Sequence, residues 1–351
     1  MIGQNIPAPP AAAGIGGSTG SVDNAILRAD GTGGATLQSA DISIDDATTS
    51  TANNVAITNQ HAGQTNSALV LTPKGTGAFI LGPKPDGTTT GGNARGAGAV
   101  DLQIGSTARN ASTQVASGAN SAILGGYRNT ASGAQSVVIG GFGNTVTGSG
   151  SIVCGGQGTS NTAGFESFVG CGNQVSVSGN ASFFGAGFQG NISASNCGIL
   201  SGSGASCDRL GMQSHASGRF SANGDAQRAR FVLRCKTTTN AAVEMALDGG
   251  TTYLSIPSGK VIACTINISG VKSDGSAVAH YVRQYAVKNV GGTSSEVYAP
   301  VTIGTDNAAG TTIALSANNG DDTLRIAVTG IASETWRWVA SVDAVEIAYG
   351  T

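Results

Sequence analysis

The sequence contains 351 residues, of which 55 are glycine, while charged residues make up only 11%; ordinary globular domains contain about half that share of glycine and about twice that share of charge. The net charge of −2 with 40% hydrophobic residues excludes the composition of a disordered chain, and eight prolines exclude a collagen repeat. The lack of a basic stripe argues against a nucleic-acid binder.

Two segments precede the central part of the chain. Residues 1–20 are rich in proline, alanine and glycine and lack the positive start and apolar core of a secretion signal. We therefore expect synthesis in a cytoplasm and a tail that is either a flexible segment or a docking peptide. Residues 21–115 contain short apolar runs separated by turns such as Asp-Gly and Lys-Gly-Thr-Gly, which predicts a β-rich shaft.

Residues 116–225 contain an internal repeat. ASGANSAILGGYRNT (116–130) is followed directly by ASGAQSVVIGGFGNT (131–145), and six copies follow one another at steps of 15 or 16 residues. β-Branched residues between glycine turns at this period predict one coil of a parallel β-solenoid per repeat. The column predicted to form the core of the roll and of its assembly with symmetry-related chains is Ile123, Val138, Val153, Val169, Phe184 and Ile199. The column predicted to form the turns is Gly126, Gly141, Gly156, Gly172, Gly187 and Gly202.

The repeat also predicts self-association. A coil this short has almost no interior, so a single roll cannot bury all of its apolar residues. Ala122 and Ile123 are both apolar and point to opposite faces of a strand. We expect one column to fill the roll and the other to pack against symmetry-related chains. Cys171 and Ala186 replace the first glycine of the usual pair, and there the roll is expected to bulge.

Residues 226–351 contain fewer glycines and longer alternating runs, such as RARFVLRC and TWRWVASVDAVEIAY. Roughly eight strands separated by polar turns predict an antiparallel β-sandwich of jelly-roll kind. Trp336 and Trp338 fall on one face of a strand, where we expect them to form core. Binding of a partner is expected in the polar loops, which are free to vary, with Asp274, Tyr298, Asp321 and Asp322 as the candidate residues.

Groups that could carry catalysis or bind a metal are sparse. The histidines His61, His215 and His280 have no partner at metal-ligand spacing, although three copies of His215 around an axis could hold a cation. The six cysteines form no CxxC pair and are expected to be buried thiols. Glycoside hydrolysis needs two facing carboxylates, and adjacent pairs such as Asp45 and Asp46 point to opposite sides of a strand. We therefore expect no enzyme activity, no catalytic residue, no metal and no cofactor.

Several segments resemble known fibrous proteins. The cadence NTASGxxSxxxGG at residues 129–141 resembles the left-handed β-roll repeats of trimeric autotransporter adhesin heads, and similar repeats occur in bacteriophage tail fibres. VDNAILRADGTGG, LVLTPKGTG and GGNARGAGAVDLQ resemble segments of tail-fibre shafts, and GDAQRARFVLRCKTT resembles the start of domains that cap such fibres. The resemblance implies three parallel chains around one axis and a place in the virion tail.

The sequence and the resemblance together predict an all-β homotrimeric tail fibre that adsorbs to the host by multivalent binding. Its N-terminus would dock on a phage tail or baseplate protein, and its C-terminal domain would bind a host-surface glycan or protein, without nucleic-acid binding or membrane insertion. A head fibre or decoration trimer, a tailspike glycanase and a bacterial adhesin fragment remain alternatives, the last of which ought to carry a secretion signal and a membrane barrel. The predicted domains are an attachment tail at 1–20, a shaft at 21–115, a left-handed β-roll at 116–225 and a receptor-binding sandwich at 226–351.

Overall fold

The structure is a computed structural model that describes residues 25–29, 37–46 and 55–59 as strands, and residues 71–103, 109–161 and 164–349 in full. Within these residues the chain forms strands, bridges and turns and no helix, which confirms the predicted all-β class. The chain divides into two compact units, Met1–Thr72 and Pro73–Thr351. The attachment tail predicted for residues 1–20 lies outside the described residues.

The first unit contains one antiparallel sheet of three strands. β1 (Ala25–Ala29) pairs with β2 (Leu37–Asp46), which pairs in turn with β3 (Val55–Asn59). Asp45 and Asp46 occupy the end of β2, opposite β3. Short strands are therefore present in the first half of the segment that the sequence assigns to a shaft.

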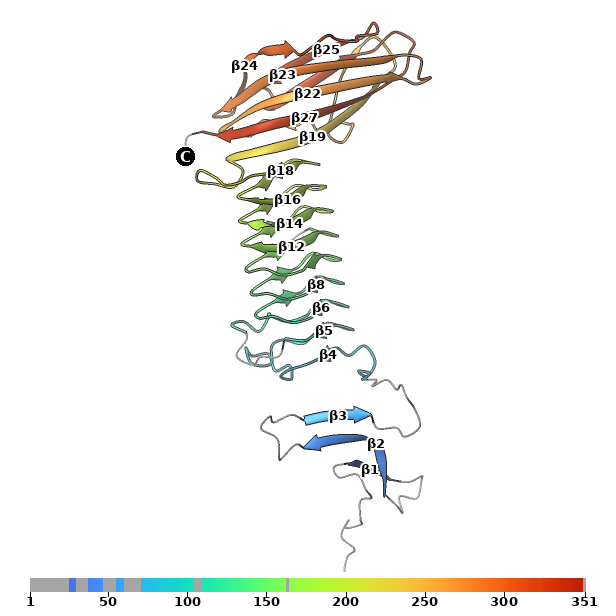
Figure 1. Cartoon of the computed structure of the whole chain (residues 1–351), viewed down its shortest axis with the longest axis vertical. Coiled ribbons are helices and arrows are strands. Elements are labelled where there is room, and N and C mark those ends of the chain that lie inside the picture. Colours follow the sequence, from blue (N-terminus) through green and yellow to red (C-terminus); the bar gives the residue numbers. More distant parts are fainter. Residues whose placement is uncertain are drawn as a thin grey trace, which may run out of the picture. The chain divides into compact units, whose positions relative to one another are not determined.

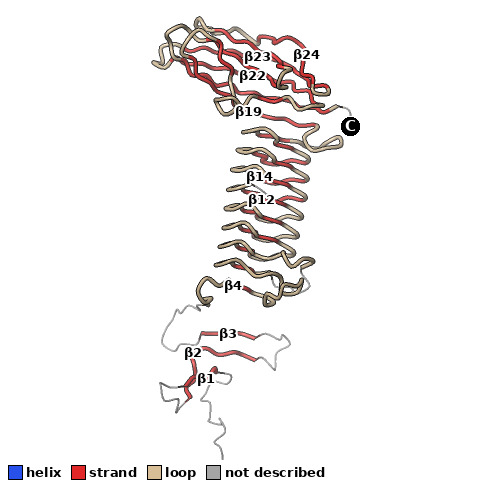
Figure 2. The backbone as a smooth tube through the Cα atoms, turned by 180° about the vertical axis from the view of Figure 1, so that it is seen from behind, coloured by secondary structure: helices blue, strands red, loops and turns tan. Residues whose placement is uncertain are grey.

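The second unit begins with a parallel β-solenoid, whose coils stack their strands into two parallel sheets (Figures 1 and 2). Partners lie one repeat apart, as Ile152 lies opposite Val137 and Phe168, which confirms one coil per repeat. The first sheet contains β4 (Phe79–Ile80), β5 (Val100–Asp101), β6 (Ala122–Ile123), β8 (Val137–Val138), β10 (Ile152–Val153), β12 (Phe168–Asn173), β14 (Phe183–Phe188), β16 (Gly198–Ser203) and β18 (Gln213–His215). The second contains β7 (Thr130–Ala131), β9 (Thr145–Val146), β11 (Ser160–Asn161), β13 (Ser176–Val177), β15 (Asn191–Ile192) and β17 (Ser206–Cys207).

The interior of the roll is two side chains wide. On the first sheet the inward column from Ile123 to Ile199 has 0% exposure at each of its six positions. It faces the inward column of the second sheet, which is also fully buried and consists of Ala131, Val146, Asn161, Val177, Ile192 and Cys207. Asn161 is the polar member, and its side-chain amide has no hydrogen-bond partner among the described residues.

Polar side chains join neighbouring coils along the turns. The Oδ1 of Asn129 accepts a hydrogen bond from Asn144 N at 3.0 Å, and the Oδ1 of Asn144 accepts one from Thr159 N, also at 3.0 Å. Before Asn129, the Gln103 side chain takes the place of a paired backbone. Its Oε1 accepts a hydrogen bond from Asn129 N at 2.7 Å, and its Nε2 donates one to Asn129 O at 3.1 Å. These bonds satisfy buried backbone groups that the short strands leave unpaired.

The parallel sheet starts upstream of the repeat, at β4 and β5. In β5 the position opposite Ile123 is taken by Asp101, which is fully buried. Its carboxylate accepts a hydrogen bond from Arg95 Nε at 2.7 Å and lies 3.8 Å from Arg109 Nη2. The coil at β5 therefore contains buried ion pairs at a position where the six repeats have apolar side chains.

Close packing of the coils accounts for the glycine column. A Cβ atom at Gly141, whose φ is +87°, would lie 2.4 Å from the carbonyl oxygen of Gly156. A non-glycine residue is disfavoured on both counts. All six glycines of this column were predicted to lie in turns, but the last three lie inside strands β12, β14 and β16, namely Gly172, Gly187 and Gly202.

The bulge expected at Cys171 and Ala186 does not form. β12 and β14 lengthen to six residues, and Cys171 pairs in register with Ala186, which pairs in register with Ser201. Replacement of the first glycine of the pair by a residue with a side chain thus extends the strand through the former turn, because such residues favour extended backbone more than glycine does.

The roll continues directly into the terminal sheets. β18 pairs antiparallel with β19, which places nine roll strands and five terminal strands in one sheet of 14 strands. The five are β24 (Thr293–Thr302), β23 (Val278–Val290), β22 (Lys260–Lys272), β27 (Trp336–Ala348) and β19 (Ala226–Thr237). A second antiparallel sheet is built on β26 (Thr323–Thr329) and contains β20 (Ala242–Glu244), β21 (Leu254–Ser255) and β25 (Thr312–Asn318).

The terminal sheets contain one Greek key. β22, β23 and β24 are consecutive, and β27 returns to lie beside β22, which is the 4-1-2-3 order of that motif. A jelly roll contains two Greek keys, and the sheet around β26 does not supply the second one, so the connectivity differs from the predicted jelly roll. Trp336 and Trp338 are 0% and 1% exposed with ring centroids 5.7 Å apart, which confirms them as core.

Candidate functional site

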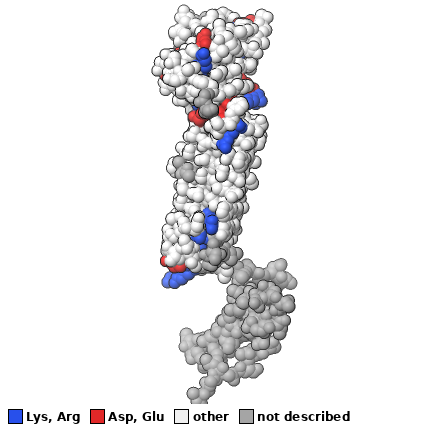
Figure 3. Space-filling view, turned by 90° about the vertical axis from the view of Figure 1, so that its left-hand side faces the viewer, with Lys and Arg blue, Asp and Glu red and all other residues white. Residues whose placement is uncertain are grey.

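The outward face of the first roll sheet carries an apolar stripe. On this face, Phe168 and Phe183 each lie next to a residue of the buried column and are 36% and 43% exposed. Their rings stack with centroids 5.5 Å apart. A parallel column adds further exposed apolar side chains, namely Leu124, Ile139 and Leu200. Figure 3 shows one side of the roll, on which charged side chains are sparse. A surface of this kind is typical of an interface between chains.

The stripe continues onto the terminal domain, because β18 and β19 belong to one sheet. There the outward face includes half-exposed valines and an isoleucine, namely Val232, Val339, Val345 and Ile347. Where the roll meets β19, this apolar face also carries charged side chains. Arg228 and Arg230 both pair with the single carboxylate of Asp343. The two guanidinium groups are thus only partly neutralised.

A pocket of about 440 Å³ lies on this face where the roll meets β19, and its lining includes Phe183, Leu200, His215, Arg228 and Arg230. The His215 ring is exposed and its Nδ1 lies 3.0 Å from Ser201 O. His215 therefore lies on the same face as the apolar stripe, and cation binding by three copies of it stays a prediction. Within the described part of the chain, no group of three or more His, Cys, Asp and Glu side chains could hold a metal ion.

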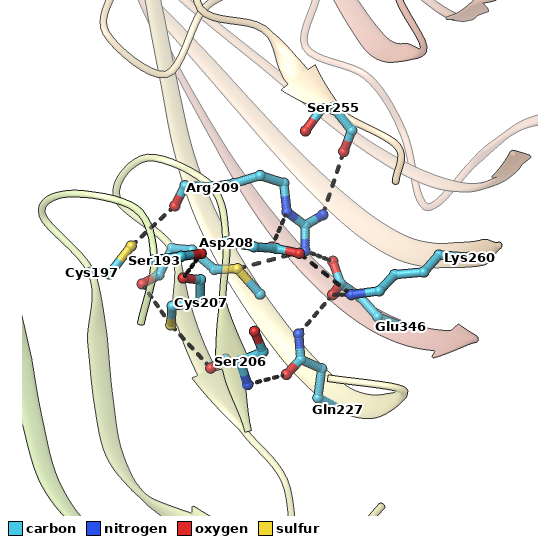
Figure 4. Close-up of polar contacts among 12 residues, drawn as sticks. Ser193, Cys197, Ser206, Cys207, Asp208, Arg209, Gln227, Ser255, Lys260 and Glu346 are labelled. Atoms are coloured by element: carbon cyan, nitrogen blue, oxygen red, sulfur yellow. Dashed lines mark hydrogen bonds and ion pairs between the residues drawn. The ribbon is translucent and has the colours of Figure 1, made fainter. Parts of the chain in front are cut away.

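A buried ionic cluster fastens the terminal sheets to the last coil (Figure 4). Arg209 Nη2 lies 2.5 Å from Glu346 Oε1, and Arg209 Nε donates to Asp208 Oδ1 at 2.9 Å. Lys260 Nζ bridges the same two carboxylates, at 3.7 Å and 3.6 Å. Gln227 Nε2 donates to Glu346 Oε2 at 2.8 Å. The side chains of Arg209 and Glu346 are 4% and 0% exposed, so these charges depend on one another.

The electrostatics of this cluster follow from its geometry. Burial by itself would raise the pKa of Asp208, but Arg209 and Lys260 together hold that pKa below its usual value. Burial likewise opposes the charge of Arg209, whereas Glu346 and Asp208 raise its pKa. Sequence reasoning missed this site, since its members come from the last coil, β22 and β27 and share no motif.

The four predicted receptor residues do not form one cluster. Asp274 lies in the exposed turn between β22 and β23, where it accepts hydrogen bonds from Ser276 and lies 3.5 Å from Lys272 Nζ. Tyr298 is 44% exposed on edge strand β24 and lines an outward pocket of about 530 Å³.

The two remaining candidates lie in the turn before β26. Asp321 pairs with Arg325, and Asp322 accepts a hydrogen bond from Ser294 Oγ at 2.7 Å. Their carboxylates are engaged within the domain. The Asp274 carboxylate is engaged as well, but its side chain is the more exposed, at 56% against 42% for Asp321.

The cysteines form no disulfide and differ in burial. All six are free thiols; three are buried, Cys154 and Cys235 are partly buried, and Cys171 is exposed. Burial raises the pKa of Cys235 to about 11 and that of Cys264 to about 12, so both remain protonated at neutral pH. The expectation of buried thiols thus fails at Cys171, where the side chain points outward from β12.

No protein-family model and no curated protein matches the sequence. The solved structures similar to the chain include three tailspike proteins of Acinetobacter phages. Tailspike gp49 of Acinetobacter baumannii bacteriophage Fri1, a capsular polysaccharide depolymerase, has a TM-score of 0.24 and 11% identity over 64% of this chain and 46% of its own. The tailspike of phage vB_ApiP_P1 has a TM-score of 0.22 and 12% identity over 65% of this chain and 51% of its own. The tailspike of phage AM24 has a TM-score of 0.19 and 8% identity over 64% of this chain and 54% of its own.

This chain spans about half the length of the tailspike proteins it matches. The comparison corrects one expectation, that the chain has no enzyme activity, because one similar structure is that of a polysaccharide depolymerase. The expectation rested on the scarcity of paired carboxylates in the sequence, and that scarcity does not decide the matter. Among the described residues none belongs to a helix of the length and hydrophobicity needed to cross a membrane.

Proposed function

We propose that the chain is a bacteriophage tail fibre or tailspike-like protein, that it forms a homotrimer, and that it binds the host surface. The observation that carries the proposal is the outward face of the 14-stranded sheet, which is apolar along the roll and onto β19 and β27. Contiguous apolar patches beyond a few hundred Å² are rare on monomeric proteins. Three copies packed face to face would remove this surface from water.

The finer parts of the proposal follow the sequence resemblance. The roll is left-handed, its three copies run parallel, and residues 1–20 attach the fibre to a tail or baseplate protein. Residues 226–351 form a sandwich that contacts a host glycan or protein, and three copies on one fibre multiply a weak single contact.

The native mass of the protein should correspond to three chains. Ile139→Glu tests the interface, because Ile139 is 46% exposed on the outward face: it costs little in a separate chain but buries a charge in a trimer. We expect this variant to dissociate at micromolar concentration in native mass spectrometry. Gln135→Glu places the same charge in an exposed turn of the same coil and should leave the mass unchanged. A folded wild-type monomer at micromolar concentration would refute the assembly.

Tyr298→Ala should reduce adsorption of virions to host cells at least about tenfold if the aromatic ring on β24 contacts the receptor. The side chain is 44% exposed, so its loss should hardly change the melting temperature. Asp274→Ala is expected to act in the same direction, and Lys236→Ala, which alters an exposed side chain on β19, is the control. Unchanged adsorption of both Tyr298→Ala and Asp274→Ala would place the receptor contact elsewhere.

Two alternatives have their own readouts. Antibody labelling of virions distinguishes a tail fibre from a head fibre or decoration trimer by position. Incubation of purified protein with host polysaccharide tests the tailspike glycanase, which would release new reducing ends.

A further inference from the structure

A groove of about 340 Å³ lies on one edge of the roll, away from residues 226–351, and crosses several coils. It is lined by aromatic, amide and guanidinium groups and by glycines, namely Asn110, Gln114, Arg128, Phe142, Gly143, Gln157, Gly158, Asn173 and Gln174. No carboxylate belongs to the lining, so Arg128 gives the groove a positive charge.

An ordered platform forms one end of the groove. The rings of Tyr127 and Phe142 stack with centroids 5.4 Å apart and planes inclined by 17°. The guanidinium carbon of Arg128 lies 5.0 Å from the Tyr127 centroid and 5.6 Å from that of Phe142. The buried Nε of Arg128 has no hydrogen-bond partner among the described residues. The ring contacts thus hold the guanidinium in place, and because Nε is buried, a ligand would bond to the two Nη groups.

Amide side chains form the other end. Asn173 Nδ2 lies 3.4 Å from Gln157 Oε1, and Gln189 Nε2 donates to Gln174 Oε1 at 2.8 Å. These bonds order the amides without using all of their donors and acceptors. Between the two ends the turn positions are Gly143 and Gly158, whose lack of side chains leaves the groove open. Arg128 and Gln174 are three coils apart, which corresponds to about 14 Å at the strand spacing of parallel sheets.

We propose that this groove binds an acidic polysaccharide, specifically a chain of hexuronate units. An apolar sugar face packs on Phe142, whose ring is 38% exposed. The sugar carboxylate pairs with the Arg128 guanidinium, the side chain best matched to carboxylate geometry, and the hydroxyl groups bond to the Gln157 and Gln174 amides. A site with flat, polar and cationic groups in a row fits an elongated ligand of this kind better than a single small molecule.

The test is isothermal titration calorimetry of the full-length protein with alginate oligosaccharides, which are chains of hexuronates, and with neutral malto-oligosaccharides of equal length. Arg128→Gly suits the backbone, because Arg128 has φ of +59°, where glycine is unstrained. We expect Arg128→Gly to weaken alginate binding by about tenfold or more, and Gln174→Gly by a smaller factor. Wild-type affinity for the neutral sugar should be far lower.

Gln135→Gly is the matched control, since Gln135 has φ of +57° in the opposite turn of the roll and does not line the groove. It should bind like the wild type, and all variants should keep the wild-type mass. No alginate binding by the wild type, equal affinity for the neutral sugar, or unaltered binding by Arg128→Gly would each overturn the proposal. The assay uses neither virions nor host cells, so its outcome is independent of the adsorption function proposed for residues 226–351.

Discussion

Gly141→Val should lower the free energy of unfolding by more than about 4 kcal/mol, among the largest effects of a single substitution. Valine is β-branched and strongly disfavoured at the φ of +87° found here. Its Cβ would also lie 2.4 Å from Gly156 O. That oxygen cannot retreat without weakening the hydrogen bonds it accepts from Phe142 N at 2.9 Å and Asn144 Nδ2 at 3.1 Å. Denaturant unfolding followed by circular dichroism measures the change.

The neighbouring glycine offers a control within the same turn. A Cβ atom at Gly140 meets nothing within 4 Å, and its φ is outside the left-handed range. Gly140→Val should therefore change the free energy of unfolding by less than about 1 kcal/mol. If the two variants unfold alike, contact between coils is not what requires glycine at position 141.

The solenoid was predictable because each coil repeats its own local signal. A glycine turn and an apolar residue recur at nearly constant spacing, and parallel stacking places equivalent residues on top of one another, as with Val138 and Val153. Spacing alone could not distinguish a glycine in a turn from one in a strand. Gly172 follows Cys171, whose side chain allows the strand to continue, and so it belongs to β12.

Other parts of the fold carry no such signal. The coil at β5 has Asp101 in the column that is apolar in the six repeats, and the compensating Arg95 precedes that strand. The pairing of β18 with β19 joins two regions of different composition. Of the candidate receptor residues, sequence could place Asp321 and Asp322 in a turn, but not their bonds to Arg325 and Ser294, which depend on tertiary packing.

The joint between roll and terminal sheets provides the second large effect. Glu346→Ala should lower the free energy of unfolding by about 3–5 kcal/mol, because Arg209 would be left buried without its closest counter-ion. Lys260, 12% exposed, and the Nε2 of Gln227 would lose a partner as well. Thermal unfolding should then begin at the joint, with the terminal sheets protected less from proteolysis than in the wild type.

A second carboxylate on β27, that of Asp343, tests whether the effect of Glu346→Ala comes from the burial of its ion pair or from the loss of a negative charge. Asp343 pairs with Arg228, but their side chains are 35% and 52% exposed, and exposed pairs contribute about 0–1 kcal/mol. The melting temperature of Asp343→Ala should therefore be close to that of the wild type, although this variant also removes one negative charge from β27. Glu346→Gln keeps the side-chain volume and a carbonyl acceptor for Gln227. Its free energy of unfolding should lie between those of Asp343→Ala and Glu346→Ala. Equal destabilisation by Asp343→Ala and Glu346→Ala would mean that net charge, and not the desolvation of Arg209, determines how firmly the terminal sheets are held to the roll.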